Sequence, residues 1–147
     1  MTLLTIGSIS KIFTLHFKNK KFTISAVKKL VSFVLPFVKQ VVYNTRNEIS
    51  VDALKKSVRK TTSEDVFQNI EKSRGGIFNV DVTLSLINSL DGVNVEHGPE
   101  VDYMNQMIEY LLTDILALAS EKVDSINGEA IESVVRADTE YCQMFIK

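Results

Sequence analysis

The sequence has few of the residues that interrupt helices or report special chemistry. Its 147 residues include two prolines, six glycines and no tryptophan. So few prolines and glycines leave room for long uninterrupted helices. The single cysteine, Cys142, excludes an internal disulfide and fits a reducing compartment. Because it lies in an apolar C-terminal run, we expect a packed thiol rather than a nucleophile.

Signals for a membrane span, a leader and an enzyme are also missing. The longest apolar stretch, residues 30–38, is far below the ~20 residues that a spanning helix needs. Residues 1–10 lack the positive region of a secretory signal, so we expect them in the mature protein. His16 and His97 stand apart, without the spacing of metal ligands, and no phosphate-loop, Gly-x-Ser-x-Gly or zinc-protease motif occurs. We therefore expect no enzyme, no metal and no cofactor.

The charge is divided unevenly along the chain, although the net charge is only −1. Residues 1–74 hold fourteen lysines and arginines against five aspartates and glutamates, whereas residues 75–147 hold three against thirteen. A boundary near Arg74-Gly75-Gly76 therefore separates a basic half from an acidic half. Either the basic half meets a polyanion and the acidic half a basic partner, or the two halves attract each other.

In the first half, the sequence predicts a short helix over residues 9–17 and then a long helix, in which Pro36 should cause a kink. Ser50 and Ser63 suit the N-caps of two further short helices, the second of which should end at Gly75-Gly76. The long helix is indicated by apolar residues at helical spacing, namely Val27, Leu30, Val31, Val34, Val38, Val41 and Val42.

The second half repeats this plan. A short helix is predicted over residues 80–90, a long one after Gly98-Pro99, and a last one after Asn127. The apolar stripe of the long helix comprises Val101, Met104, Ile108, Leu111, Leu112, Ile115, Leu118, Ala119 and Val123. A long helix between two short ones cannot bury both of its faces alone. Two such units clasped together can do so.

The second half resembles core histone 2A at three separated points, in the right order. Gly76-Ile77-Phe78-Asn79-Val80 is similar to the entry into that histone's first helix. Glu109-Tyr110-Leu111-Leu112-Thr113-Asp114-Ile115-Leu116-Ala117-Leu118-Ala119 resembles its Glu-Tyr-Leu-Thr-Ala-Glu-Ile-Leu-Glu-Leu-Ala. Ile131 to Tyr141, with Val135-Arg136-Ala137-Asp138-Thr139-Glu140, resembles the segment with Ile-Arg-Asn-Asp-Glu-Glu.

The first half resembles histone 2B through Tyr43-Asn44-Thr45-Arg46-Asn47-Glu48-Ile49-Ser50 and Val58-Arg59. The order, 2B then 2A, is similar to the fused histone doublets of giant DNA viruses. The resemblance implies an all-α protein with two consecutive histone folds, residues 1–74 and 75–147, that form an intramolecular handshake. It further implies a DNA-packaging protein that joins a histone 4–3-like doublet, or equivalent histones, in a nucleosome-like particle. It would work in a virion, a viral factory or a nucleus.

The resemblance also selects candidate contacts to double-stranded DNA. Packaging needs no reading of bases; it needs basic side chains, small hydroxyl donors and helix N-termini directed at phosphates. The candidates lie in the first loop, at the start of the long helix and in the second loop: Lys18, Lys20, Lys21, Thr23, Ser25, Lys28, Lys29 and Arg46. Arg46 matches the arginine of the family's second loop. The alternative is that these lysines only keep the surface soluble.

A second candidate site is acidic and would bind basic peptides through arginine anchors. Four of its residues match the acidic patch of the nucleosome: Glu109, Asp114, Asp138 and Glu140. Glu64 or Asp65, together with Glu71, would add the share of the first half. The alternative is an ordinary solvated helix face. An ion pair between Arg136 and Asp138 would brace the last helix.

Departures from the family support two rival functions. Arginines of histone 2A that contact DNA align here with Val82, Ser85 and Asn88, and its second-loop arginine aligns near Ser125. Loss of these arginines favours a histone-fold regulatory subunit that acts mainly through protein pairing, with little DNA wrapping. The other rival is an acidic chaperone that binds basic histones without DNA.

Overall fold

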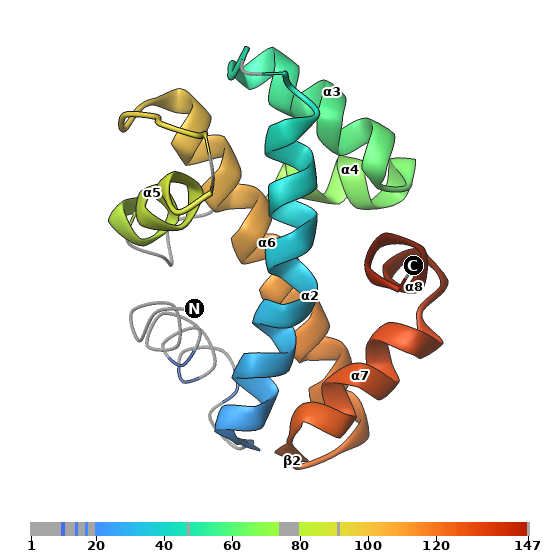
Figure 1. Cartoon of the computed structure of the whole chain (residues 1–147). Helices are drawn as coiled ribbons and strands as arrows, with labels where there is room; N and C mark the ends of the chain where they lie inside the picture. Colours follow the sequence, from blue (N-terminus) through green and yellow to red (C-terminus); the bar gives the residue numbers. More distant parts are fainter. Residues whose placement is uncertain are drawn as a thin grey trace. The chain divides into compact units, whose positions relative to one another are not determined.

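The described part of the chain is mostly α-helical, as its sequence predicts (Figure 1), and it also contains two short strands that the sequence did not predict. The computed structural model describes residues 20–46, 48–73, 80–90 and 92–146, together with Ser10, Thr14 and Phe17. The predicted helix over residues 9–17 therefore lies largely outside the described residues, and so do Lys18 and the boundary at Arg74-Gly75-Gly76.

The helix α2, Ile24–Tyr43, is the long helix predicted for the first half. All seven apolar residues of its predicted stripe are buried, from Val27 to Val42. Valine is a weak helix former, so burial of this face rather than intrinsic propensity stabilises the helix. Pro36 lies inside the helix, as predicted.

Two short helices follow, α3 (Val51–Thr61) and α4 (Glu64–Lys72). The side chain of Ser50 accepts a hydrogen bond from the backbone of Ala53 at 3.1 Å, and Ser63 accepts one from Val66 at 3.2 Å. Both predicted N-caps are thereby confirmed. The helix α4 ends at Lys72, earlier than the predicted Gly75-Gly76.

The second half contains α5 (Val80–Asn88), α6 (Pro99–Lys122), α7 (Gly128–Ala137) and α8 (Thr139–Phe145). The start of α6 at Pro99 confirms the predicted proline entry. Asn127 caps α7 by accepting a hydrogen bond from the backbone of Ala130 at 2.9 Å. The sequence did not predict α8 as a separate helix.

Two compact units share the chain, and neither coincides with one sequence half. The first unit comprises the described residues of 1–35 and 111–147, and the second comprises those of 36–110. The first unit therefore holds the N-terminal part of α2 and the C-terminal part of α6. The second unit holds the C-terminal part of α2 and the N-terminal part of α6. Each unit combines residues of the basic and the acidic half.

Candidate nucleic-acid interface

The predicted basic loop lies beside a distant part of the chain in the first unit. The strand β1, Lys21–Phe22, pairs in parallel with β2, Ser125–Ile126, and Lys21 is opposite Ser125. The backbone N–H of Lys21 donates to the Asp124 carbonyl at 3.0 Å, and that of Thr23 donates to the Ile126 carbonyl at 2.9 Å. Figure 1 shows β2 beside the start of α2. The pairing fixes the basic loop against the loop between α6 and α7.

Two helix N-termini meet at this strand pair. The side chain of Ser25, in the first turn of α2, accepts a hydrogen bond from the backbone N–H of Gly128, the first residue of α7. An open pocket of about 700 Å³ lies between the two helix starts, and Lys28, Lys29 and Asn127 are among its lining residues. Helix N-termini carry partial positive charge and unpaired N–H groups, so such a place attracts anions.

Six of the predicted phosphate-contact residues gather here. We call them the paired-loop surface: Lys20, Lys21, Thr23, Ser25, Lys28 and Lys29. Lys21, Thr23, Ser25 and Lys28 are exposed, and the other two are partly exposed. The hydroxyls of Thr23 and Ser25 are joined by a hydrogen bond of 2.7 Å. The segment from Lys20 to Lys29 thus carries cations and hydroxyl groups that are exposed or partly exposed.

Carboxylates of the acidic half neutralise part of this surface. Lys20 Nζ lies 2.7 Å from Asp124 Oδ1, and Lys29 Nζ lies 3.5 Å from Glu132 Oε1. The hydrogen bond from Lys20, followed by its charge, lowers the pKa of Asp124. The hydrogen bond from Arg136, followed by the charge of Lys29, lowers the pKa of Glu132. Both acids therefore remain ionised at neutral pH and offset part of the positive charge of this surface.

Arg46 belongs to the second unit, after the end of α2. It is exposed, and its φ of 54° lies in the left-handed region, which non-glycine residues seldom occupy. Its backbone N–H donates a hydrogen bond to the Tyr43 carbonyl at 3.1 Å. In the next turn, the backbone N–H of Glu48 donates to the Thr45 carbonyl. This turn places the arginine at the surface of its unit, as a DNA contact requires.

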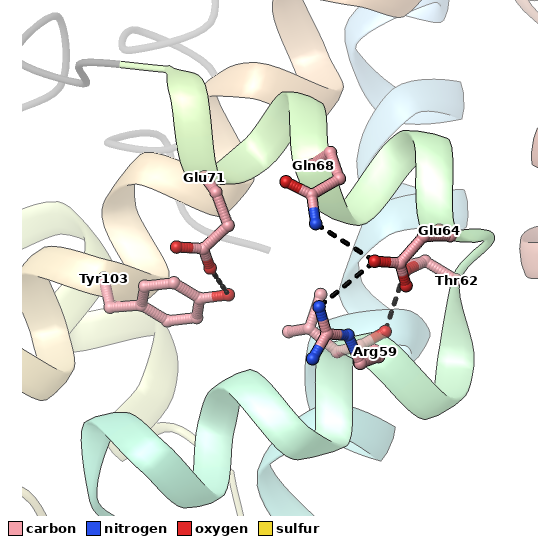
Figure 2. A network of polar contacts seen from close by, with 7 residues as sticks. Arg59, Thr62, Glu64, Gln68, Glu71 and Tyr103 are labelled. Carbon is pink, nitrogen blue, oxygen red and sulfur yellow. Dashed lines mark hydrogen bonds and ion pairs between the residues drawn. The ribbon is translucent and has the colours of Figure 1, made fainter.

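Two of the three acidic residues predicted for the first half, Glu64 and Glu71, have partners within the second unit. Figure 2 shows Glu64 accepting hydrogen bonds from Arg59 and from Gln68, at 3.1 and 3.0 Å. These bonds, Gln68 first and Arg59 next, lower the pKa of Glu64. Asp65 is exposed.

Glu71, the third of these acids, lies 3.2 Å from Lys55 and accepts a hydrogen bond from the hydroxyl of Tyr103 at 3.2 Å (Figure 2). Burial, followed by the charge of Glu71, raises the pKa of Tyr103. Glu64 and Glu71 therefore brace α3 and α4 as well as carrying charge.

The prediction that Glu109 lies on an exposed acidic face is wrong. The residue is only 3% exposed, because α6 is buried around most of its circumference at this point. Asn105 Nδ2 donates to Glu109 Oε1 at 3.4 Å, and Thr83 Oγ1 donates to Asn105 Oδ1 at 2.5 Å. Glu109 thus belongs to a buried polar network of the second unit.

The other three acids lie in the first unit and are partly exposed. Asp114 accepts a hydrogen bond from the Tyr141 hydroxyl, and Asp138 caps α8 by accepting one from the backbone of Tyr141 at 2.9 Å. Glu140 lies in the first turn of α8. The predicted brace between Arg136 and Asp138 is wrong, because Arg136 pairs with Glu132 at 3.3 Å.

Sequence reasoning missed Asp124 and Glu132, the two acids that pair with lysines of the paired-loop surface. Lys20 and Asp124 are separated by 104 positions, so no local spacing could reveal the pair. Only the β1–β2 register brings them together. The opposite net charges of the two halves indicated that the halves could attract each other, but they did not indicate which residues would pair.

No protein-family model matches the chain, and no curated protein sequence matches it. In the described part of the chain, no helix is long and apolar enough to cross a membrane. The same residues contain no group of three or more histidine, cysteine or carboxylate side chains arranged to hold a metal ion.

Proposed function

We propose that this protein is a fused pair of histone folds that packages double-stranded DNA without reading its sequence. In this proposal the first half acts as a histone 2B and the second as a histone 2A. The pair joins a histone 4–3-like doublet, or equivalent histones, and DNA bends around the resulting core. The protein has a structural rather than an enzymatic role.

The observation that carries the proposal is the parallel pairing of β1 with β2. It joins the basic loop that precedes one long helix to the loop that follows the other long helix. The same contact brings the N-termini of α2 and α7 together through Ser25 and Gly128. Lysines, hydroxyls and two helix N-termini on one surface suit a phosphate backbone and offer no evident means of reading base edges.

The composition of the two units also supports a handshake. Each unit takes the N-terminal part of one long helix and the C-terminal part of the other. Separate histone folds that merely follow each other along the chain would instead give one unit per half. Exchange of helix ends is what an intramolecular histone pair requires, because each long helix needs its counterpart to bury its apolar stripe.

The ion pairs of the paired-loop surface are compatible with phosphate binding. The side chain of Asp124 is 95% exposed, so its pair with Lys20 lies in water. Such a pair contributes little to stability, and a polyanion can displace the carboxylate. Lys21 and Lys28 form no ion pair with a described carboxylate. They are the first cations on this surface that DNA would meet.

The salt dependence of DNA binding tests this surface. Replacing Lys20, Lys21 and Arg46 with alanine should weaken binding and make the plot of log affinity against log salt less steep, by roughly 0.9 for each phosphate that these side chains neutralise. Circular dichroism should show that the helices are retained. If the variant binds DNA with unchanged affinity and slope, the proposed surface is incorrect.

A second candidate function is a histone-fold regulatory subunit that acts by protein pairing. Neutralisation of Lys20 and Lys29 by Asp124 and Glu132 favours it, because a dedicated DNA surface would keep its cations unpaired. Reconstitution with histone partners distinguishes the two functions. A stable complex that leaves DNA open to nuclease supports the regulatory subunit and contradicts packaging.

A further inference from the structure

A groove lined by cationic residues lies in the second unit, where α2 ends and α3 begins. It has a volume of about 610 Å³, and its lining includes three cationic residues, Arg46, Lys56 and Lys60. All three are exposed. Only Arg46 was predicted from the sequence, since the two α3 lysines fall in no recognisable motif. We call these three residues the α3 basic groove.

The cations of this groove have no carboxylate partners in the described chain. No ion pair there involves Arg46, Lys56 or Lys60. The neighbouring cations of α3 differ, because Lys55 lies 3.2 Å from Glu71 and Arg59 lies 3.1 Å from Glu64. One face of α3 is thus neutralised by α4. The groove face carries three cations without ion pairs against two carboxylates, Glu48 and Asp52, which also line the groove.

The groove is held in shape by contacts that do not involve its cations. The buried hydroxyl of Ser57 donates to the Val41 carbonyl at 2.8 Å and ties α3 to the last turns of α2. Thr45 Oγ1 donates to the Val42 carbonyl at 2.6 Å, and Ser50 caps α3. Because other residues fix both walls, the lysines can be replaced without removing these contacts.

We propose that the α3 basic groove holds a phosphodiester backbone, with Lys56 and Lys60 as phosphate ligands beside Arg46. This inference rests on the proposed function and extends its DNA surface along α3. Lys56 and Lys60 are one turn apart, about 6 Å along the helix axis. A DNA strand carries a phosphate every ~3.4 Å of its axis, so the two lysines reach separate phosphates.

DNA fits this groove better than an acidic peptide does. Two of the three cations are lysines, which act as point charges and hold phosphates without a strict geometry. Carboxylate recognition is strongest with the bidentate fork of arginine, which only Arg46 offers here. The hydroxyl of Ser50 and the amide of Asn44, which also line the groove, can donate to phosphate oxygens.

The test compares two double variants of the full chain that lose the same charge. Lys56→Ala/Lys60→Ala removes the groove lysines, and Lys55→Ala/Lys72→Ala removes a paired lysine and an exposed lysine outside the groove. Binding to a mixed-sequence DNA duplex is measured over a range of salt concentrations, with circular dichroism for each variant. We expect the slope of log affinity against log salt to fall by about 1.8 for the first variant, and to stay near the wild-type value for the second.

Four other outcomes contradict the inference, and each shows whether the groove alone or also the proposed function is incorrect. An unchanged slope for Lys56→Ala/Lys60→Ala overturns the groove alone, if Lys20→Ala/Lys21→Ala still lowers the slope. Equal reductions of the slope in the two double variants show an effect of net charge and overturn the groove. Preference of the wild type for a polyglutamate peptide over the duplex, lost in Lys56→Ala/Lys60→Ala, makes the groove a protein site and overturns the inference. Absence of DNA binding by the wild type overturns both the groove and the proposed function.

Discussion

The hydroxyl of Ser25 accepts a hydrogen bond from the backbone N–H of Gly128 at 3.0 Å, across 103 positions of sequence. It joins the first turn of α2, in the basic half, to the first residue of α7, in the acidic half. The N–H groups of a first helical turn have no partner within their own helix. A side chain of one half therefore satisfies a backbone group of the other half.

Removal of this link should destabilise the first unit. Ser25→Ala leaves the Gly128 N–H without its acceptor, and we expect a loss of roughly 1 kcal/mol in the free energy of unfolding. Urea denaturation followed by circular dichroism measures it. Ser32→Ala is the matched control, because the Ser32 hydroxyl donates only to the Lys29 carbonyl of its own helix. Equal stability of the two variants would show that the link contributes nothing.

Two substitutions of Asp138 separate its role as a helix cap from the effect of its charge. Asp138→Ala should lower stability by about 1 kcal/mol, because the first turn of α8 loses its cap. Asp138→Asn should keep most of the stability, since asparagine caps helices about as well as aspartate. Thermal and urea unfolding compare the two. If Asp138→Asn is as unstable as Asp138→Ala, the charge rather than the cap accounts for the effect.

Release of Lys20 from its carboxylate partner should strengthen DNA binding. In Asp124→Asn the Lys20 ammonium loses its ion pair and no carboxylate has to be displaced, so we expect tighter binding at each salt concentration. Glu121→Gln, at the exposed end of α6, removes the same charge without a described ion pair and is the control. Fluorescence anisotropy with labelled duplex gives both affinities. Equal changes in the two variants would mean that the pair itself does not limit phosphate binding.

Tyr103 should make stability depend on alkaline pH. Its raised pKa means that the fold favours the neutral phenol. That contribution is fully present below the ordinary phenol pKa of about 10 and is lost as the pH rises above it, because only the unfolded chain then releases the proton. Denaturation at a series of pH values should show a shallower decline in stability above pH ~10 for Tyr103→Phe than for the wild type. Identical curves would contradict a raised pKa for Tyr103.

Local patterns predicted the helices well, because each signal acts within a few residues. Helical spacing found α2, and the capping side chains of Ser50, Ser63 and Asn127 each mark a helix start. Gly98-Pro99 marked the start of α6 for the same reason. These signals depend on hydrogen bonds and dihedral angles within one turn, which the sequence specifies directly.

Features that depend on distant contacts were not predictable in the same way. Glu109 matched an exposed position of the resembled family, yet the packing around α6 buries it beside Asn105. The pairing of Lys20 with Asp124 follows from the β1–β2 register, which no periodicity encodes. The lysines of the basic loop are visible in the sequence as a local run. The ion pairs that neutralise Lys20 and Lys29 depend on tertiary contacts, so only the structure reveals them.

Nuclease digestion of reconstituted particles tests the central claim most directly. The protein is mixed with histone partners resembling histones 3 and 4 and with DNA, and the protected fragments are sized after digestion. DNA packaging by a fused histone pair predicts one discrete protected length, which is absent when the protein is omitted. A stable protein complex whose DNA is digested without any protected fragment would contradict it.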